Sequence, residues 1–127
     1  MTPLTEGKYV IKFITRAKES NKSSLMGSYL AQQAIITKTA DFMTITLHIL
    51  DNEIVLGFQL EGSSDWEEAV EYRVDDVTNQ RFELFDLHEL TETINARIQY
   101  EYPEDGKILK TDEEFRIEFD QASLETI

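Results

Sequence analysis

The chain has 127 residues, no cysteine and a formal net charge of −13. Without cysteine it can form neither a disulfide nor a thiolate metal site. The negative charge argues against nucleic acid as a partner, because phosphate binding needs many lysine and arginine side chains. No stretch approaches the roughly 18 apolar residues of a membrane span, and this length suffices for one domain with its own core.

Short runs of alternating apolar and polar residues follow one another along the chain, which is the pattern of half-buried β-strands. Turn-forming residues separate the runs, for example those at 51–52 and 103–106. About eight antiparallel strands, packed as a sandwich or a barrel, are therefore expected. The predicted strands cover residues 9–14, 34–38, 42–49, 54–60, 69–74, 81–85, 94–102 and 115–119.

Two segments break the strand pattern. Residues 18–30 are polar and then helical in pattern, with Ser23 or Ser24 as a plausible N-cap. Residues 84–93 could hold a short turn of helix between two strands. The domain is expected to run over residues 5–120, with residues 121–127 as a C-terminal tail.

The sequence shows no pattern typical of an active site. His48 lies between Leu47 and Ile49, so it is expected to point to solvent from a strand. His88 stands near carboxylates, but a zinc site needs three or four convergent ligands, and no second pair occurs at ligand spacing. Neither a nucleophile elbow nor a glycine-rich phosphate loop is present. The protein is therefore not expected to be an enzyme.

Several segments resemble the NEAT domains of haem-uptake surface proteins from Gram-positive bacteria. Residues 6–13 (EGKYVIKF) are similar to the opening strand of that family, and residues 24–29 (SLMGSY) to its haem-covering lid. Residues 54–58 and 94–103 fall where the family has an aromatic-rich strand and the strand before its last hairpin, and residues 115–120 resemble its closing strand. The resemblance implies an all-β, immunoglobulin-like antiparallel sandwich with a short helical lid and a haem slot between lid and hairpin.

The resemblance also implies a set of residues around a b-type haem. In haem-binding members the last hairpin carries Tyr-x-x-x-Tyr, whose first tyrosine ligates iron, but residues 107–114 here contain no tyrosine. The predicted haem-contacting residues are Leu25, Met26, Tyr29, Val55, Phe58, Tyr100, Tyr102, Leu109 and Lys110.

The replacement for the missing iron ligand can be chosen by its protonation cost. A thioether ligates haem iron without losing a proton. A lysine would spend about 4.6 kcal/mol on deprotonation at pH 7 and a tyrosine ~4 kcal/mol, although ferric iron compensates a phenolate well. Met26 is therefore the predicted metal ligand, with Tyr102 or a hairpin lysine opposite. Met26 could instead pack as an ordinary apolar lid residue.

Charge is unevenly distributed along the chain. Residues 1–38 carry six basic side chains and only two acidic ones. Arg16, Lys18 and Lys22 flank the predicted lid and are expected to meet the haem propionates, unless they form an ordinary solvated loop.

These observations predict a haem-uptake module of a Gram-positive cell-surface or secreted receptor, excised from a larger protein. Its predicted partners are haem and, as donor, haemoglobin or another haemoprotein. The alternative is an interaction module of the same fold that binds no haem and docks a haemoprotein or a neighbouring domain. Residues 25–28 lack the aromatic cluster found in the lid of globin-binding members, which weakens that alternative.

Overall fold

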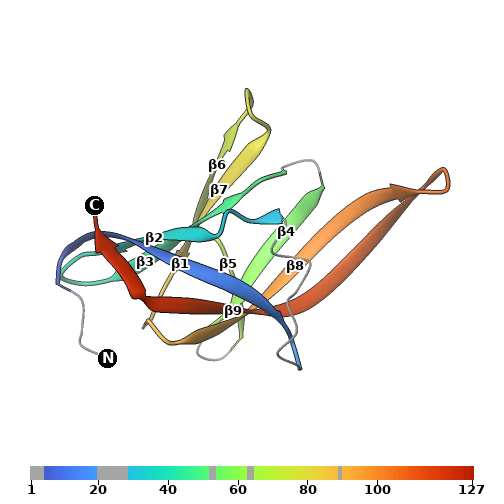
Figure 1. Ribbon diagram of the computed structural model, residues 1–127. Coiled ribbons are helices and arrows are strands. Elements are labelled where there is room, and N and C mark those ends of the chain that lie inside the picture. The colour runs from blue at the N-terminus through green and yellow to red at the C-terminus, as the bar shows by residue number, and fades with distance from the viewer. Residues whose placement is uncertain (1–4, 20–28, 52–53, 63–64, 89) are drawn as a thin grey trace.

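The computed structural model describes residues 5–19, 29–51, 54–62, 65–88 and 90–127, with the side chains of Tyr102 and Glu104 excepted. In these ranges the chain forms a single nine-stranded sheet in which all pairings are antiparallel (Figure 1). The strand order is β5-β4-β8-β9-β1-β2-β3-β7-β6. The strands are β1 (Gly7–Ala17), β2 (Gln33–Lys38), β3 (Met43–Ile49), β4 (Val55–Glu61), β5 (Trp66–Glu68), β6 (Glu71–Asp75), β7 (Gln80–Asp86), β8 (Thr93–Glu104) and β9 (Lys107–Thr126).

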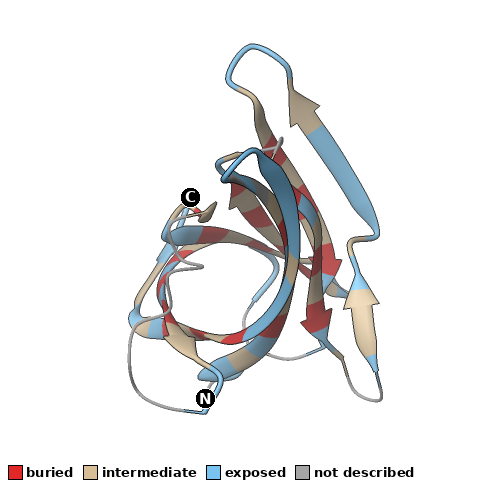
Figure 2. Ribbon diagram, turned by 90° about the vertical axis from the view of Figure 1, so that its right-hand side faces the viewer, coloured by how far each residue is buried: buried red, intermediate tan, exposed pale blue. Residues whose placement is uncertain are grey.

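The sheet folds over so that its two ends face each other across one core. The Phe58 ring on β4 packs edge-on against Phe85 on β7 and Phe115 on β9, with ring centroids 6.0 and 5.9 Å apart. Buried positions line the strands that curve around this interior (Figure 2). The all-β, immunoglobulin-like sandwich expected from the sequence is thereby confirmed.

The period-two pattern explains which side chains fill the core. Ile11 and Phe13 on β1 are buried while Lys12 and Ile14 between them are exposed. Strand β4 departs from this pattern, since Val55 and Phe58 are both buried although three residues apart. The pairing with β8 shifts register between Val55 and Gly57, and such a bulge returns both side chains to the inner face.

All eight predicted strands are present, and the differences lie at the strand ends and in one extra strand. Strand β5 was not expected, and β9 begins at Lys107, eight residues before the prediction. The predicted helical turn within residues 84–93 is wrong for the described residues, because 84–86 complete β7, residue 93 begins β8 and the described residues between them are irregular. The proposed N-caps and most of the predicted lid lie in residues 20–28, outside the described ranges.

The C-terminal residues continue the sheet. Residues 121–126, predicted to be part of a tail, extend β9, and Glu125 and Thr126 pair with Val10 and Tyr9. The domain limits themselves stay a prediction. Within the described ranges no helix is long and apolar enough to cross a membrane.

The last hairpin extends beyond the rest of the sandwich (Figure 1). β1 meets β9 no nearer the hairpin tip than Phe115, and β4 pairs with β8 only up to Tyr100. Strands β8 and β9 nevertheless stay paired out to Glu104 and Lys107. Glu101 N still donates a backbone hydrogen bond to Ile54 O, and residues 102–114 beyond it form a two-stranded ribbon. Its turn has positive φ at Asp105 (51°) and Gly106 (76°), the type I′ geometry that an Asp-Gly pair favours.

Candidate functional site

The inner face of the β8–β9 hairpin brings several predicted site residues to one place. Residues that pair directly across antiparallel strands share a face of the sheet. Tyr100 pairs with Thr111, and Ile98, two residues earlier and also buried, pairs with Glu113. The inner face therefore runs from the core through these pairs towards the ribbon tip.

Tyr100 is the centre of this face. Its ring lies 5.5 Å from the ring of Tyr29, which directly follows the undescribed residues 20–28. On its other side Tyr100 pairs with the fully buried Val55. The structure thus brings together three of the predicted haem-contacting residues, Tyr29, Val55 and Tyr100.

The Tyr100 hydroxyl connects this apolar group to a charged one. Tyr100 Oη donates a hydrogen bond to Glu113 Oε1 at 3.0 Å. Only 7% of Tyr100 is exposed, whereas Glu113 lies at the surface. The phenol oxygen therefore sits where the buried inner face meets solvent.

The other predicted site residues occupy different positions. Leu109 lies on the same face and is 37% exposed. Tyr102 pairs with Leu109 in the backbone register, and its side chain is outside the described part of the structure. Lys110 pairs with Glu101 and so falls on the opposite face of the ribbon. Phe58 lies deeper, in the core contacts given above. Leu25 and Met26 lie outside the described residues, and all of these roles stay predictions.

Glu113 was not among the predicted site residues, although the sequence holds a signal for it. A two-residue Asp-Gly turn fixes the register of the strands that it joins. Asp105 and Gly106 thereby determine that Tyr100 lies opposite Thr111 and diagonal to Glu113.

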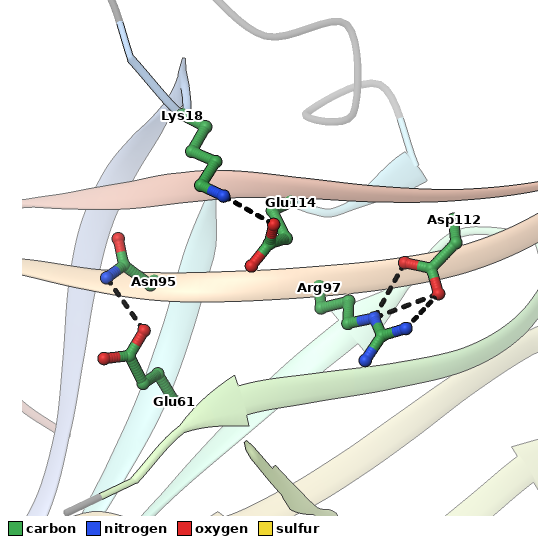
Figure 3. Close-up of polar contacts among 6 residues, drawn as sticks. All are labelled: Lys18, Glu61, Asn95, Arg97, Asp112 and Glu114. Carbon is green, nitrogen blue, oxygen red and sulfur yellow. Dashed lines mark hydrogen bonds and ion pairs between the residues drawn. The ribbon is translucent and has the colours of Figure 1, made fainter. Parts of the chain in front are cut away.

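The opposite, outer face of the hairpin is covered by charge pairs (Figure 3). Arg97 Nε donates to both carboxylate oxygens of Asp112, at 2.7 and 3.0 Å, and this pairing holds the pKa of Asp112 below its ordinary value. Lys18 Nζ donates to Glu114 Oε2 at 2.7 Å, which raises the pKa of Lys18. This face is therefore a solvated polar surface.

Two of the three cations expected at the haem propionates belong to this outer surface. Arg16 Nε lies 3.5 Å from Glu118 Oε2, and Lys18 contacts Glu114. Both carboxylates are on β9 and face away from Tyr100. The geometry does not favour the expected propionate contacts of Arg16 and Lys18, and Lys22 lies outside the described residues.

The histidines do not form a metal centre in the described ranges. His48 is on the outer face, stacked on Phe82 at 4.3 Å and hydrogen-bonded to Gln80 at 2.6 Å. His88 Nε2 lies 3.2 Å from Glu67 Oε2, beside a cavity of about 270 Å³ at the end of the sandwich opposite Tyr100. No group of three His, Cys, Asp or Glu side chains in the described part of the chain is arranged to hold a metal ion.

A haem fits the inner face better than a bare metal ion does. A porphyrin supplies four ligands itself, so the protein needs to offer one or two donors and an apolar surface. The inner face provides apolar surface from Tyr29 and Leu109, and an oxygen donor on Tyr100. The donor set of the described residues is thus compatible with an iron porphyrin.

Comparison with known proteins agrees with this geometry. The model of the NEAT family, described as the Iron Transport-associated domain, matches residues 2–122. Hemin/hemoglobin-binding protein 2 of Listeria monocytogenes serovar 1/2a is 24% identical over 123 residues, or 95% of this chain and 22% of the relative. The chain therefore spans about a fifth of that protein's length.

Two solved structures share the fold. The NEAT5 domain of IsdX2, a B. anthracis hemophore in complex with heme, superposes with a TM-score of 0.81 at 22% identity, covering 91% of this chain and 97% of that one. A mutant of the same domain, also in complex with heme, has a TM-score of 0.81 at 23% identity and covers 92% and 97% of the two chains.

Proposed function

This chain belongs to the NEAT family of iron transport-associated domains, and on that premise we propose that it is a non-enzymatic haem-binding module. The observation that carries the proposal is the contact between Tyr29 and Tyr100 on the apolar inner face of the hairpin. This contact brings the C-terminal end of the predicted lid onto the strand pair that a haem would cover. The heme complexes of the two NEAT5 structures support the same ligand.

The biological setting is part of the proposal. The module would act in a cell-surface or secreted receptor of a Gram-positive bacterium and take haem from haemoglobin or another haemoprotein. The name and greater length of the Listeria relative support this setting.

Haemin titration of the purified domain tests the proposal. A one-to-one complex should give a saturable Soret shift, because most of the porphyrin would be buried against an apolar surface. A titration without saturation would refute haem binding. Pull-down of haemoglobin by the same haem-free sample would then favour the docking module.

Within this proposal Met26 is the iron ligand on the lid side. Its role is tested by Met26→Leu, which removes the sulfur and keeps an apolar side chain of similar volume. The spectrum of bound haem should change, because the iron loses a thioether. Met43 provides a matched control, since it is half-buried and packs against the core on β3. An unchanged spectrum in Met26→Leu would show that the ligand is a different residue.

A further inference from the structure

We propose that the edge strand β6 pairs with β6 of a second copy of this chain, so that two copies form a dimer through one continuous sheet. The two strands run antiparallel, and Tyr72 lies opposite Tyr72 of the second copy. The inference does not depend on haem, because β1, β2, β3 and β7 separate β6 from the β8–β9 hairpin in the sheet order.

Strand β6 has one free edge. It ends the sheet order, so in the described ranges β7 is its one neighbour, and the β6–β7 hairpin projects from the body of the sandwich (Figure 1). Such an edge leaves a row of backbone N–H and C=O groups available to another strand. Natural edge strands are commonly protected by proline, lysine or a bulge. Residues 71–75 contain neither proline nor lysine, and they pair with β7 in an unbroken register.

Two large apolar side chains at this edge are exposed. Val70, which directly precedes β6, is 58% exposed, and Tyr72 is 68% exposed. Tyr72 and the half-buried Val74 alternate along the strand with Glu71 and Arg73, so the apolar and the charged side chains lie on opposite faces. A second strand at this edge would therefore cover apolar side chains on one face and meet charged ones on the other.

The sequence of the edge is complementary to itself. A two-fold antiparallel pairing places one residue opposite its own copy, because directly opposed residues must share a face of the sheet. With Tyr72 at this centre, Glu71 lies opposite Arg73 of the second copy, and the symmetry creates this ion pair twice. On the other face Val70 lies opposite Val74 of the second copy, also twice. Opposite charges and apolar side chains are thus matched across the whole edge.

The neighbouring registers are less favourable. A pairing centred on Glu71 places that carboxylate opposite its own copy, and one centred on Arg73 places Glu71 opposite Asp75. Like charges directly opposite each other destabilise a strand pair. A pairing centred on Val74 needs Asp75, whose carboxylate already accepts hydrogen bonds from two backbone amides of the following turn. The register centred on Tyr72 is therefore the one that the charges favour.

The dimer is expected to be weak and dependent on concentration. A strand of five residues is a small edge beside the roughly 800 Å² per partner of a stable interface. Each copy carries a net charge of −13, so the two copies repel each other at long range. At about 0.15 M ionic strength the Debye length is about 8 Å, and most of this repulsion is screened. Association is therefore expected at physiological salt and high protein concentration.

Sedimentation velocity of the haem-free protein over a range of concentrations tests the proposal. Wild type should change from monomer to dimer as its concentration rises. Arg73→Glu and Glu71→Arg each place like charges opposite each other twice, and each should weaken self-association by about tenfold or more. An equimolar mixture of these two variants should dimerise again, because the acidic edge of one meets the basic edge of the other. The double variant that carries both changes should also self-associate.

Two controls make the same charge changes away from this edge. Lys12→Glu changes an exposed residue of β1, and Glu125→Arg changes an exposed residue of β9, and both strands lie in the middle of the sheet order. Both variants should self-associate as wild type does.

Single cysteines test the register, since the chain has no cysteine of its own. Directly opposed residues of antiparallel strands have Cα atoms roughly 4.5–5.5 Å apart, which a disulfide can bridge. Tyr72→Cys should therefore form a disulfide-linked dimer under mild oxidation. The two copies of Arg73→Cys would have Cα atoms about 8 Å apart and should form little of it.

Each outcome decides the proposal. Wild type that stays monomeric at every concentration would overturn it and leave the edge to a strand of a different protein. Dimers that persist in both charge variants, or cross-link equally at positions 72 and 73, would place the interface elsewhere and refute it. Arg73→Glu also loses the contact of the guanidinium with the Phe82 ring at 5.0 Å. If that variant does not fold, Glu71→Arg and the two cysteine variants still decide.

Discussion

A buried ion pair on β7 gives the sharpest stability prediction. Arg81 and Glu83 are 8% and 7% exposed and lie on the inner face of the strand with Phe85. Arg81 Nε is 3.2 Å from Glu83 Oε1, and the facing residues of β3 are Ile49 and Leu47. Burial raises the pKa of Glu83, and Arg81 opposes that rise only in part.

The variant Arg81→Met should destabilise the protein to an extent that depends on pH. Without the guanidinium, Glu83 can stay buried only if it takes up a proton. Protonation from an ordinary pKa of 4.5 costs 1.36 kcal/mol per pH unit, which gives about 3.4 kcal/mol at pH 7 and about 0.7 kcal/mol at pH 5. Because the folded pKa lies above the unfolded one, the folded state binds the proton more tightly, and stability falls as pH rises between the two values.

Urea denaturation at pH 5 and pH 7 measures this difference. Arg81→Met should lose roughly 3 kcal/mol relative to wild type at pH 7 and about 1 kcal/mol at pH 5. For a domain of this size, 1 kcal/mol corresponds to about 4 °C in the midpoint of thermal unfolding. The double variant Arg81→Met with Glu83→Leu should be close to wild type or more stable, since both charges leave the core. Equal losses at the two pH values would show that lost packing dominates and that the buried charge does not.

Three further predictions concern the hairpin and its surroundings. Gly106→Ala should lower the free energy of unfolding by about 1 kcal/mol in urea denaturation, because the φ of 76° at this position disfavours a side chain. No atom lies within 4 Å of the added Cβ, so a steric clash is not the cause. Equal stability of the variant and wild type would contradict this reasoning. Arg97→Gln should raise the pKa of Asp112 towards 3.8 by NMR titration, while the pKa of Asp75, lowered by the backbone amides of Val77 and Thr78, stays unchanged. Since the pKa of Asp112 is depressed in the folded state, its stabilising contribution is present above pH 3.8 and is lost as pH falls through the folded value. Replacing Arg16 and Lys18 by glutamine should change haemin affinity less than about threefold, because both cations pair with β9 on the outer face; a larger loss would place the propionates beside them.

Most of the fold could be predicted from the sequence because its core strands alternate regularly. The exceptions share a physical cause. Residues 107–114 hold only two apolar side chains, Ile108 and Leu109, which are adjacent and so fall on opposite faces; the segment therefore carries no apolar period to recognise. Strand β5 has only three residues, too few to show alternation.

The site was predicted less completely than the fold. Tyr29, Val55 and Tyr100 came from a family resemblance, and the structure brings these three together. Lys110 was chosen for its chemistry alone, and the hairpin register places it on the opposite face. Chemistry restricts which residue types can serve as ligands, whereas the face of a strand depends on a pairing register that composition does not reveal.

The location of the proposed site follows from where the two layers separate. Up to Phe115 and Tyr100, the hairpin is flanked by β1, which pairs with β9, and by β4, which pairs with β8. Beyond them the same inner face continues without either strand, and Leu109 there is 37% exposed. The ribbon already holds its own backbone hydrogen bonds, so an exposed apolar side chain such as Leu109 costs little folding energy there, and it gains stability when an apolar ligand covers it. The extension of β8 and β9 beyond their neighbours is therefore the structural feature on which the proposed porphyrin binding depends.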